Sequence, residues 1–227
     1  MTILVVVTHP DDEMLGCGAS IAKWTKADKV VHILIMAEDA SSRDVDRNAD
    51  TKNEELSLLV RSAQQAGKIL GAASVKLLGF PDNRMDSLDR LDVVKAVEAE
   101  IERLQPHTVI THHSGDVNID HRITHEAVVT ACRPQPSHSV RRLLAFEVPS
   151  STEWQPPSSN VAFQPNCFED VSETLDRKIE ALKVYKSEMR EWPHARSIQS
   201  IEHLARWRGS SVGYDAAEAF ILLRELK

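Results

Sequence analysis

The sequence predicts an α/β protein in which a mostly parallel sheet lies between two layers of helices. Short, continuously apolar segments alternate with longer segments of helical periodicity along most of the chain. Alternation of strands with helices is typical of parallel sheets whose strands are joined by helical crossovers. Polar residues gather directly after several of the apolar segments, so a site is expected at the carboxyl ends of the strands.

The first elements follow from two apolar runs. Residues 3–8 are apolar or β-branched without interruption and stop at Pro10, which predicts a buried strand. A helix is expected over 13–27, because small and apolar residues recur on one side of that segment. Residues 29–37 form the second apolar run and predict a second buried strand.

A polar segment interrupts the alternation before it resumes. Residues 38–52 are rich in Asp, Arg and Ser and show no apolar period, so we expect a loop over one end of the sheet. Periodicity returns over 53–70, a helix that Gly71 would close. A third strand is predicted over 74–79 and a further helix over 88–104.

The alternation continues once more before the pattern becomes irregular. The sequence predicts a fourth strand over 107–112, a helix over 120–132 that stops before a proline, and a fifth strand over 142–148. Residues 149–170 contain several prolines and serines, which predicts an irregular insertion with weak β-structure.

The remainder is expected to pack on the same sheet. Helices are predicted over 171–190 and 198–208, and the tail 214–226 fits either a helix or a strand. No internal repeat and no low-complexity tract marks a boundary. We therefore expect one domain over 1–227, with 171–227 packed against the rest.

Composition narrows the class of protein. A formal net charge of −7 implies no strong basic field, which disfavours nucleic acid as a partner. No apolar run is long enough to span a membrane, and the first residues lack the features of a signal peptide. The cysteines Cys17, Cys132 and Cys167 are odd in number and widely spaced, which fits reduced thiols in a cytoplasmic protein.

The first strand runs straight into His9-Pro10-Asp11-Asp12-Glu13, where three carboxylates stand side by side. A helix N-terminus stabilises a negative charge by roughly 0.3–1 kcal/mol, which does not offset their mutual repulsion. A divalent cation would, because it is the largest local charge in such a site. The stretch therefore predicts a metal site, although an ordinary polar helix start is the alternative.

A second stretch supplies a further ligand. His121 stands at the start of the helix after the fourth strand, as His9 stands near the start of the first helix. His9, Asp12 and His121 together offer two imidazoles and one carboxylate with a fourth position open, the pattern of a catalytic zinc site. Asp11 could then take a proton from a water, and Asp120 could orient a ring.

These motifs resemble those of the LmbE/PIG-L-like zinc-dependent N-acetyl-sugar deacetylases. The resemblance covers most of residues 3–132 and is carried by the segments 9–13, 78–82 and 116–121. A weaker similarity to some members runs from His194 through Arg196-Ser197 to the tail.

The resemblance implies a Rossmann-like three-layer fold and a divalent metal, usually Zn²⁺, with Fe²⁺ as the other candidate. It assigns His9, Asp12 and His121 as ligands and Asp11 as general base. The implied reaction releases acetate from an N-acetylated amino sugar of the N-acetylglucosamine type, or from its conjugate. Similar proteins are commonly oligomers, so a homo-oligomer is implied.

One position departs from the family pattern. Many members carry a histidine where this chain has Asn118. An asparagine can donate a neutral hydrogen bond to an oxyanion, but it cannot release a proton near neutral pH. Either Asp11 carries the proton both ways, or His113, His125 or His194 assists.

Three side chains are candidates for binding the substrate, each with a plainer alternative. Asp82 could contact a sugar hydroxyl or be a turn aspartate. Arg61 could bind a sugar or phosphate group, although a solvated helix charge is the simpler interpretation. His125 follows His121 by one helical turn and is either structural or faces the substrate.

Two other classes of function remain as alternatives. Two histidines and a carboxylate also form the facial triad of nonhaem iron oxygenases, but these use a different fold, and Asp11 would have no role. A non-catalytic nucleotide-binding protein is the second alternative. No G-x-G-x-x-G follows the first strand, and Gly16-Cys17-Gly18 lies inside the first helix instead.

Overall fold

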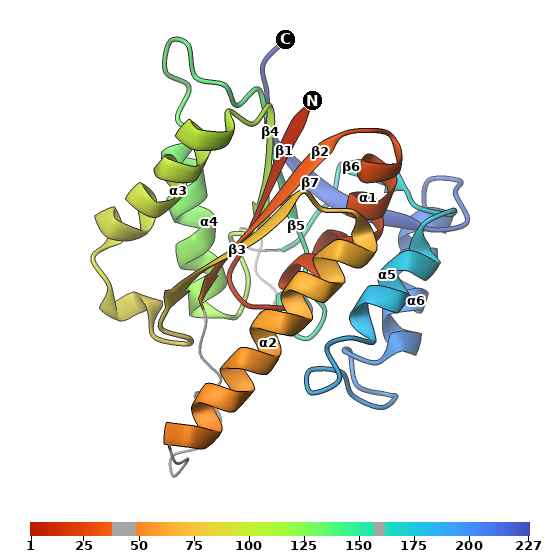
Figure 1. The fold of residues 1–227 in the computed structure, drawn as a ribbon. Coiled ribbons are helices and arrows are strands. Elements are labelled where there is room, and N and C mark those ends of the chain that lie inside the picture. The colour runs from red at the N-terminus through yellow and green to blue at the C-terminus, as the bar shows by residue number, and fades with distance from the viewer. Residues whose placement is uncertain (38–48, 157–161) are drawn as a thin grey trace.

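A computed structural model describes residues 1–37, 49–156 and 162–227. In this part of the chain, the strands form one seven-stranded sheet in the order β3-β2-β1-β4-β5-β7-β6 (Figure 1). The strands are β1 (Thr2–Val7), β2 (Val30–Ala37), β3 (Ser74–Phe80), β4 (Thr108–His112), β5 (Arg142–Phe146), β6 (Cys167–Asp170) and β7 (Ala217–Glu225). The helices are α1 (Asp12–Lys26), α2 (Ala49–Leu70), α3 (Arg90–Leu104), α4 (Ile119–Ala131), α5 (Leu175–Leu182) and α6 (Ile198–Ser210), with short 3₁₀ turns η1 (Met85–Ser87) and η2 (Thr152–Trp154).

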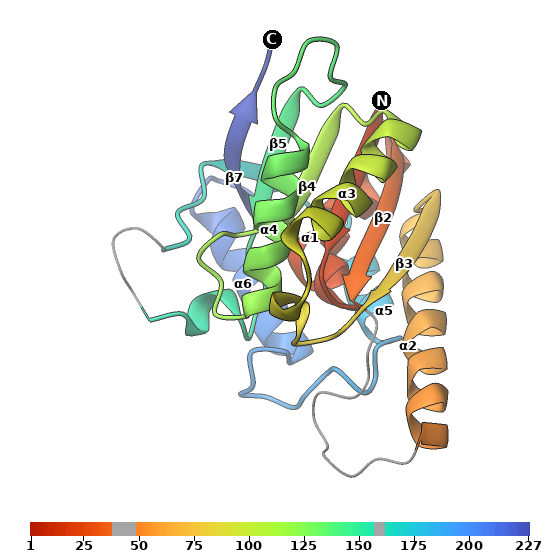
Figure 2. The same cartoon turned by 90° about the vertical axis from the view of Figure 1, so that its left-hand side faces the viewer.

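The sheet is mostly parallel, as predicted. Strands β1 to β5 run parallel to one another, whereas β7 pairs antiparallel with both β5 and β6. The carboxyl ends of the parallel strands therefore share one edge of the sheet. Both termini of the chain lie at the opposite end (Figures 1 and 2).

Helices cover both faces of the sheet. α3 and α4 lie together on the face turned to the viewer in Figure 2, and α1, α2, α5 and α6 cover the other face. Residues 3–7 of β1 are all apolar because Ile3, Val5 and Val7 enter one core cluster, while Leu4 and Val6 enter the other. A strand buried on both faces has no position left for a polar side chain.

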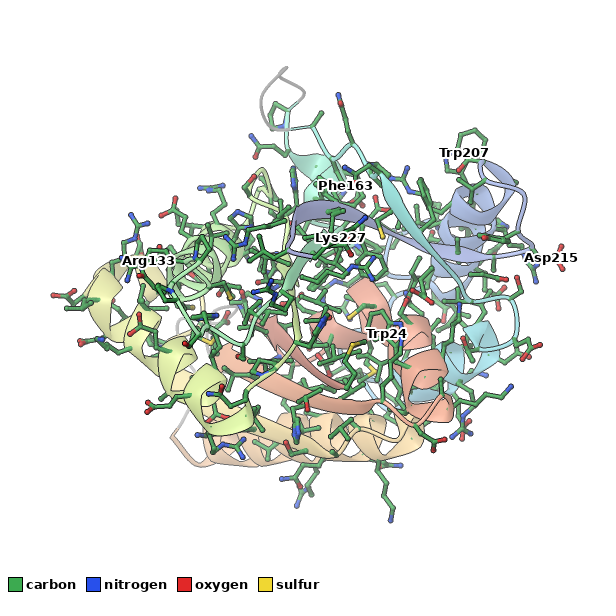
Figure 3. All side chains as sticks on the ribbon, turned by 90° about the horizontal axis from the view of Figure 1, so that it is seen from above. Trp24, Arg133, Phe163, Trp207, Asp215 and Lys227 are labelled. Carbon is green, nitrogen blue, oxygen red and sulfur yellow. The ribbon has the colours of Figure 1, made fainter. Side chains whose placement is uncertain are left out.

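Helix α1 is buried along most of its length, whereas α6 has an exposed face. Trp24 at the end of α1 lies among packed side chains and is 5% exposed, whereas Trp207 on α6 projects at the edge of the molecule and is 68% exposed (Figure 3).

Among the described residues, no helix combines the length and the apolar character needed to cross a bilayer.

Two predicted elements differ from the structure. The helix predicted over 171–190 ends at Leu182, because the chain then turns so that the Tyr185 ring is buried and its hydroxyl reaches Glu13. α2 begins at Ala49, so the last part of the predicted loop 38–52 is helical, and residues 38–48 lie outside the described part. A segment without an apolar period can still be helical, because a helix that is stabilised by packing further along the chain can extend into it.

The structure shows what the two ambiguous segments, 214–226 and 149–170, form. The tail is a strand, β7, because it pairs with neighbours on both sides. Within 149–170, the described residues contain the turn η2 and the short strand β6, in line with an irregular segment of weak β-structure.

Helix α1 is broken at Cys17, whose φ of −147° is not helical. The break lies beside Gly16, where a Cβ would collide with the Phe146 ring, so only glycine lets β5 approach this closely. Backbone groups on both sides of the break need partners from elsewhere.

Two buried charges from the C-terminal part supply these partners. The Lys178 ammonium donates to the Leu15 carbonyl at 2.7 Å, and the Glu218 carboxylate accepts from the backbone N–H groups of Ala19 and Ser20. Lys178 and Glu218 also form an ion pair at 2.7 Å. The helix that begins at the metal motif is therefore held by residues far along the chain.

Candidate metal centre

Three predicted ligands meet at the carboxyl edge of the sheet. His9 Nδ1 lies 3.4 Å from Asp12 Oδ2, His121 Nε2 lies 3.3 Å from the same oxygen, and the two ring nitrogens are 3.2 Å apart. Ligands bonded to zinc at 2.0–2.1 Å in a tetrahedral arrangement are roughly 3.3–3.4 Å from one another. The triangle therefore has the size that a tetrahedral cation requires.

The local backbone places each ligand. His9 follows β1, and Asp12 is the first residue of α1, so one short turn presents both side chains. His121 lies in the first turn of α4, whose N-cap is Asn118; the Asn118 side-chain oxygen accepts from the Asp120 backbone N–H at 2.8 Å. Because β1 and β4 are parallel neighbours, the two turns face each other.

The second nitrogen of His9 faces two carboxylates. Its Nε2 lies 2.9 Å from Asp82 Oδ1 and 3.7 Å from Asp120 Oδ2. Asp120 is fixed by the Met85 backbone N–H, which donates to its Oδ1 at 3.1 Å. The ring that Asp120 faces is thus that of His9, across the site, and not that of its sequence neighbour His121.

The second nitrogen of His121 faces a residue that the sequence analysis did not single out. His121 Nδ1 lies 3.2 Å from Asp116 Oδ1. Thr152 donates to Asp116 Oδ2 at 2.6 Å, and the Ser151 hydroxyl donates to Oδ1. A carboxylate on the far nitrogen of a metal-binding histidine fixes the ring and its tautomer. The signal was present, because Asp116 opens the same motif, but sequence spacing does not show which aspartate faces the ring.

His112 completes the packing around the ligands. Its ring stacks on His121 with centroids 4.0 Å apart, and its Nε2 accepts from the Thr8 backbone N–H at 2.9 Å. That bond leaves the proton of the neutral ring on Nδ1. Burial lowers the pKa of His112 well below its usual value, so the ring stays neutral beside its neighbours.

Protons and a cation compete for the ligand nitrogens. Burial lowers the pKa of the His121 imidazole, but Asp12 and Asp116 outweigh burial and raise this pKa to about 9. Burial also lowers the pKa of His9, but the carboxylates of Asp12, Asp120 and Asp82 outweigh burial and raise this pKa well above the usual range. A metal must displace these protons, so it binds more tightly as pH rises.

The Asp11 side chain is not part of the ligand triangle and instead contacts an arginine far along the sequence. Its Oδ2 accepts from Arg196 Nη1 at 2.7 Å, and its side chain is buried. Burial raises the pKa of Asp11 to about 7, although the Arg196 guanidinium acts in the opposite direction. Composition and spacing did not point to Arg196; the only signal was the weak resemblance of the segment around it.

Glu13, the third adjacent carboxylate, does not face the triangle. Its Oε1 accepts from the Tyr185 hydroxyl at 2.5 Å, and its Oε2 accepts from the Asp11 backbone N–H at 3.1 Å. Burial raises the pKa of Glu13 to about 8. The expectation that one cation offsets all three charges is therefore wrong for Asp11 and Glu13, whose partners are Arg196 and Tyr185; Asp12 lies in the triangle.

The three substrate candidates lie in different surroundings. Asp82 is at the site, against His9. His125 is nearly buried on α4, and its Nδ1 donates to the His112 carbonyl at 2.7 Å. Arg61 is exposed on α2, and no hydrogen bond or ion pair joins it to the described residues of the site.

Comparison with known proteins identifies relatives of this chain. The model of the PIG-L family, described as GlcNAc-PI de-N-acetylase, matches residues 4–132. The chain belongs to the PIG-L family. The matched residues include the ligand triangle and Asp116, but not Arg196, Lys178 or Glu218.

Relatives and a solved structure extend the similarity over nearly the whole chain. The uncharacterized deacetylase YaiS of Escherichia coli K12 is 32% identical over 193 residues, 82% of this chain and 90% of YaiS. The probable N-acetyl-α-D-glucosaminyl L-malate deacetylase 2 of Bacillus cereus is 26% identical over 210 residues, 90% of this chain and 93% of that protein. GalB, the 4-carboxy-2-hydroxymuconate hydratase of Pseudomonas putida KT2440, has a TM-score of 0.78 at 21% identity, covering 100% of this chain and 97% of GalB. At this identity, the likeness to GalB shows a shared fold.

Replacing Asp116 tests its contact with His121. We expect Asp116→Asn to weaken the affinity for a divalent metal such as Zn²⁺ by about 10- to 100-fold, because the amide no longer fixes the His121 ring as a carboxylate does. Competition with a chromophoric chelator measures this affinity. Asp86→Asn, an exposed aspartate in η1, is the matched control. Equal metal affinities of the two variants would show that the contact of Asp116 with His121 does not affect metal binding.

Proposed function

We propose that this PIG-L family member is a zinc-dependent hydrolase that removes the N-acetyl group from an amino sugar or its conjugate and releases acetate. The observation that supports it most directly is the triangle of His9 Nδ1, Asp12 Oδ2 and His121 Nε2, with edges of 3.2–3.4 Å. Two imidazoles, one carboxylate and an open fourth position are typical of catalytic zinc and uncommon in structural zinc sites.

His9, Asp12 and His121 would hold the cation. The buried Oδ1 of Asp12 makes no hydrogen bond within the described residues, which fits a carboxylate whose charge is balanced by a metal. When bound, zinc would supply Lewis acidity, polarising a carbonyl and lowering the pKa of a water toward about 7. Asp82, Asp120 and Asp116 orient the two rings.

Proton transfer falls to Asp11. Its carboxylate takes a proton from the attacking water and later gives a proton to the departing amine, as the C–N bond breaks and acetate leaves. Burial makes the Asp11 carboxyl a better proton acceptor than an exposed aspartate, which suits the removal of a proton from water. We assign to Asn118 a hydrogen bond to the oxyanion, donated by its amide nitrogen, since its oxygen caps α4.

The substrate class rests on the relatives. YaiS is named a deacetylase, and the Bacillus cereus protein is named for an N-acetylglucosaminyl conjugate of malate. The fold alone does not identify the reaction, because GalB is a hydratase with the same architecture. Sequence identity to deacetylases over most of the chain therefore favours amide hydrolysis.

An acetate-release screen tests the proposal. Zinc-loaded protein is incubated with N-acetylglucosamine, N,N′-diacetylchitobiose and N-acetylglucosaminyl malate, and acetate and primary amine are both quantified. We expect equimolar acetate and amine from at least one compound, loss of turnover with a chelator and recovery with Zn²⁺. Turnover that needs ferrous iron and oxygen would indicate an oxygenase, and no acetate from any compound would contradict the proposal.

A further inference from the structure

We propose that Arg196 is a positioning residue that holds the Asp11 carboxylate in its working orientation. The inference rests on the proposed function, because it assumes that Asp11 carries the proton. Arg196 lies in the C-terminal part, beyond the residues that match the family model. Its Nη1 donates to Asp11 Oδ2 at 2.7 Å, in a pair whose two side chains are both largely buried.

Asp11 needs such support because its backbone is strained. Its φ of 115° is a conformation that residues other than glycine seldom adopt, and it persists only where neighbouring contacts hold it. Glu13 accepts from the Asp11 backbone N–H, and the Tyr185 hydroxyl fixes Glu13 in turn. The side chain and the backbone of Asp11 are thus both secured from the segment 185–196.

The guanidinium is itself fixed before any substrate arrives. Arg196 Nε donates to Ser150 Oγ at 2.7 Å, and Nη1 lies 3.4 Å from Glu188 Oε2. The Arg196 backbone N–H donates to His194 Nδ1 at 3.0 Å. A planar guanidinium held at two of its nitrogens offers a donor in one defined direction, which a flexible ammonium does not.

The contact determines which carboxylate oxygen is free. Arg196 occupies Oδ2 of Asp11, and within the described residues Oδ1 makes no hydrogen bond. Oδ1 is therefore the oxygen left to exchange a proton. Without Arg196, the buried carboxylate loses its charge partner and its fixed rotamer, and misplacement of a catalytic group by about 1 Å can cost roughly 100-fold in rate.

The same loop links the base to a ligand. Ser150 accepts from Arg196, while its neighbours Ser151 and Thr152 donate to Asp116, which faces His121. One short segment after β5 therefore sets the position of Asp11 on one side and of His121 on the other. This arrangement favours a role in the geometry of the reaction over a purely structural ion pair.

Kinetics of Arg196 variants test the proposal. We expect Arg196→Ala to lower kcat by about 100-fold, with KM and bound zinc close to those of the wild type. Added guanidinium ion should restore part of kcat in Arg196→Ala, and Arg196→Lys should retain more activity than Arg196→Ala. Arg190→Ala is the matched control, because Arg190 is exposed on the same segment and its guanidinium donates to the backbone carbonyls of Ser187 and Met189. An unchanged kcat with a raised KM would make Arg196 a substrate-binding residue and overturn the proposal, as would an equal loss in Arg190→Ala.

A second measurement does not depend on turnover. The unfolding free energies of Asp11→Ala, Arg196→Met and the double variant form a cycle, in which a direct contact makes the effects non-additive because each single variant removes it. Additive effects would overturn the proposal whatever the activity. If the wild type releases no acetate from any compound, the proposed function fails, while the cycle still reports on the Arg196–Asp11 contact.

Discussion

For the proposed zinc hydrolase, Asp11→Asn is expected to lower kcat by about 100- to 10,000-fold without loss of bound metal. Asparagine has the same shape as aspartate, tolerates a positive φ and can still accept a hydrogen bond from Arg196. It cannot take up a proton. Steady-state kinetics on the substrate found in the acetate screen and metal analysis of the same sample measure the two effects.

Asp28→Asn is the matched control for this prediction. Asp28 also has a positive φ, 56°, but it lies in the turn after α1, at the end of the helix remote from the metal motif. Its variant should therefore retain wild-type kcat. A near-normal rate in Asp11→Asn would remove Asp11 from proton transfer, and loss of zinc would show that the substitution disturbs the ligands.

Lys178→Met is expected to lower the free energy of unfolding by about 3–5 kcal/mol. The side chains of Lys178 and Glu218 are 5% and 4% exposed, so the substitution leaves a carboxylate buried without its counter-ion. The Leu15 carbonyl at the break in α1 also loses its donor. Urea unfolding followed by circular dichroism measures the change, provided that the slope of the transition stays constant.

Lys186→Met provides the comparison. Lys186 is exposed a few residues further on, where a surface substitution usually changes stability by no more than about 0.5 kcal/mol. If Lys178→Met costs no more than Lys186→Met, the buried pair is not what holds the broken helix.

The parallel part of the fold could be predicted because its strands are apolar without interruption. Such runs are stable only where helices cover both faces of a sheet, as for β1. The tail could not be assigned, because its Ala, Glu and Leu residues favour a helix locally. Pairing with β5 and β6, which no local pattern reveals, makes it a strand.

The ligand triangle was accessible from the sequence for a similar reason. His9 and His121 follow neighbouring parallel strands, whose carboxyl ends must share an edge. The partners of these groups were less accessible, because they depend on the direction in which each side chain points. Asp120 adjoins His121 in sequence yet faces His9, and Arg196 meets Asp11 across a separation of 185 residues.

The hydrogen bonds from Lys178 and Glu218 at the break in α1 limit how far this protein can be truncated. Residues 4–132 contain every ligand of the triangle and look like a minimal catalytic unit. A truncation there would remove Lys178 and Glu218, the partners of the peptide groups at the break, together with α5 and β7, which pack against α1. Such a fragment would carry the complete signature of the chemistry and lack the means to keep its first helix in place.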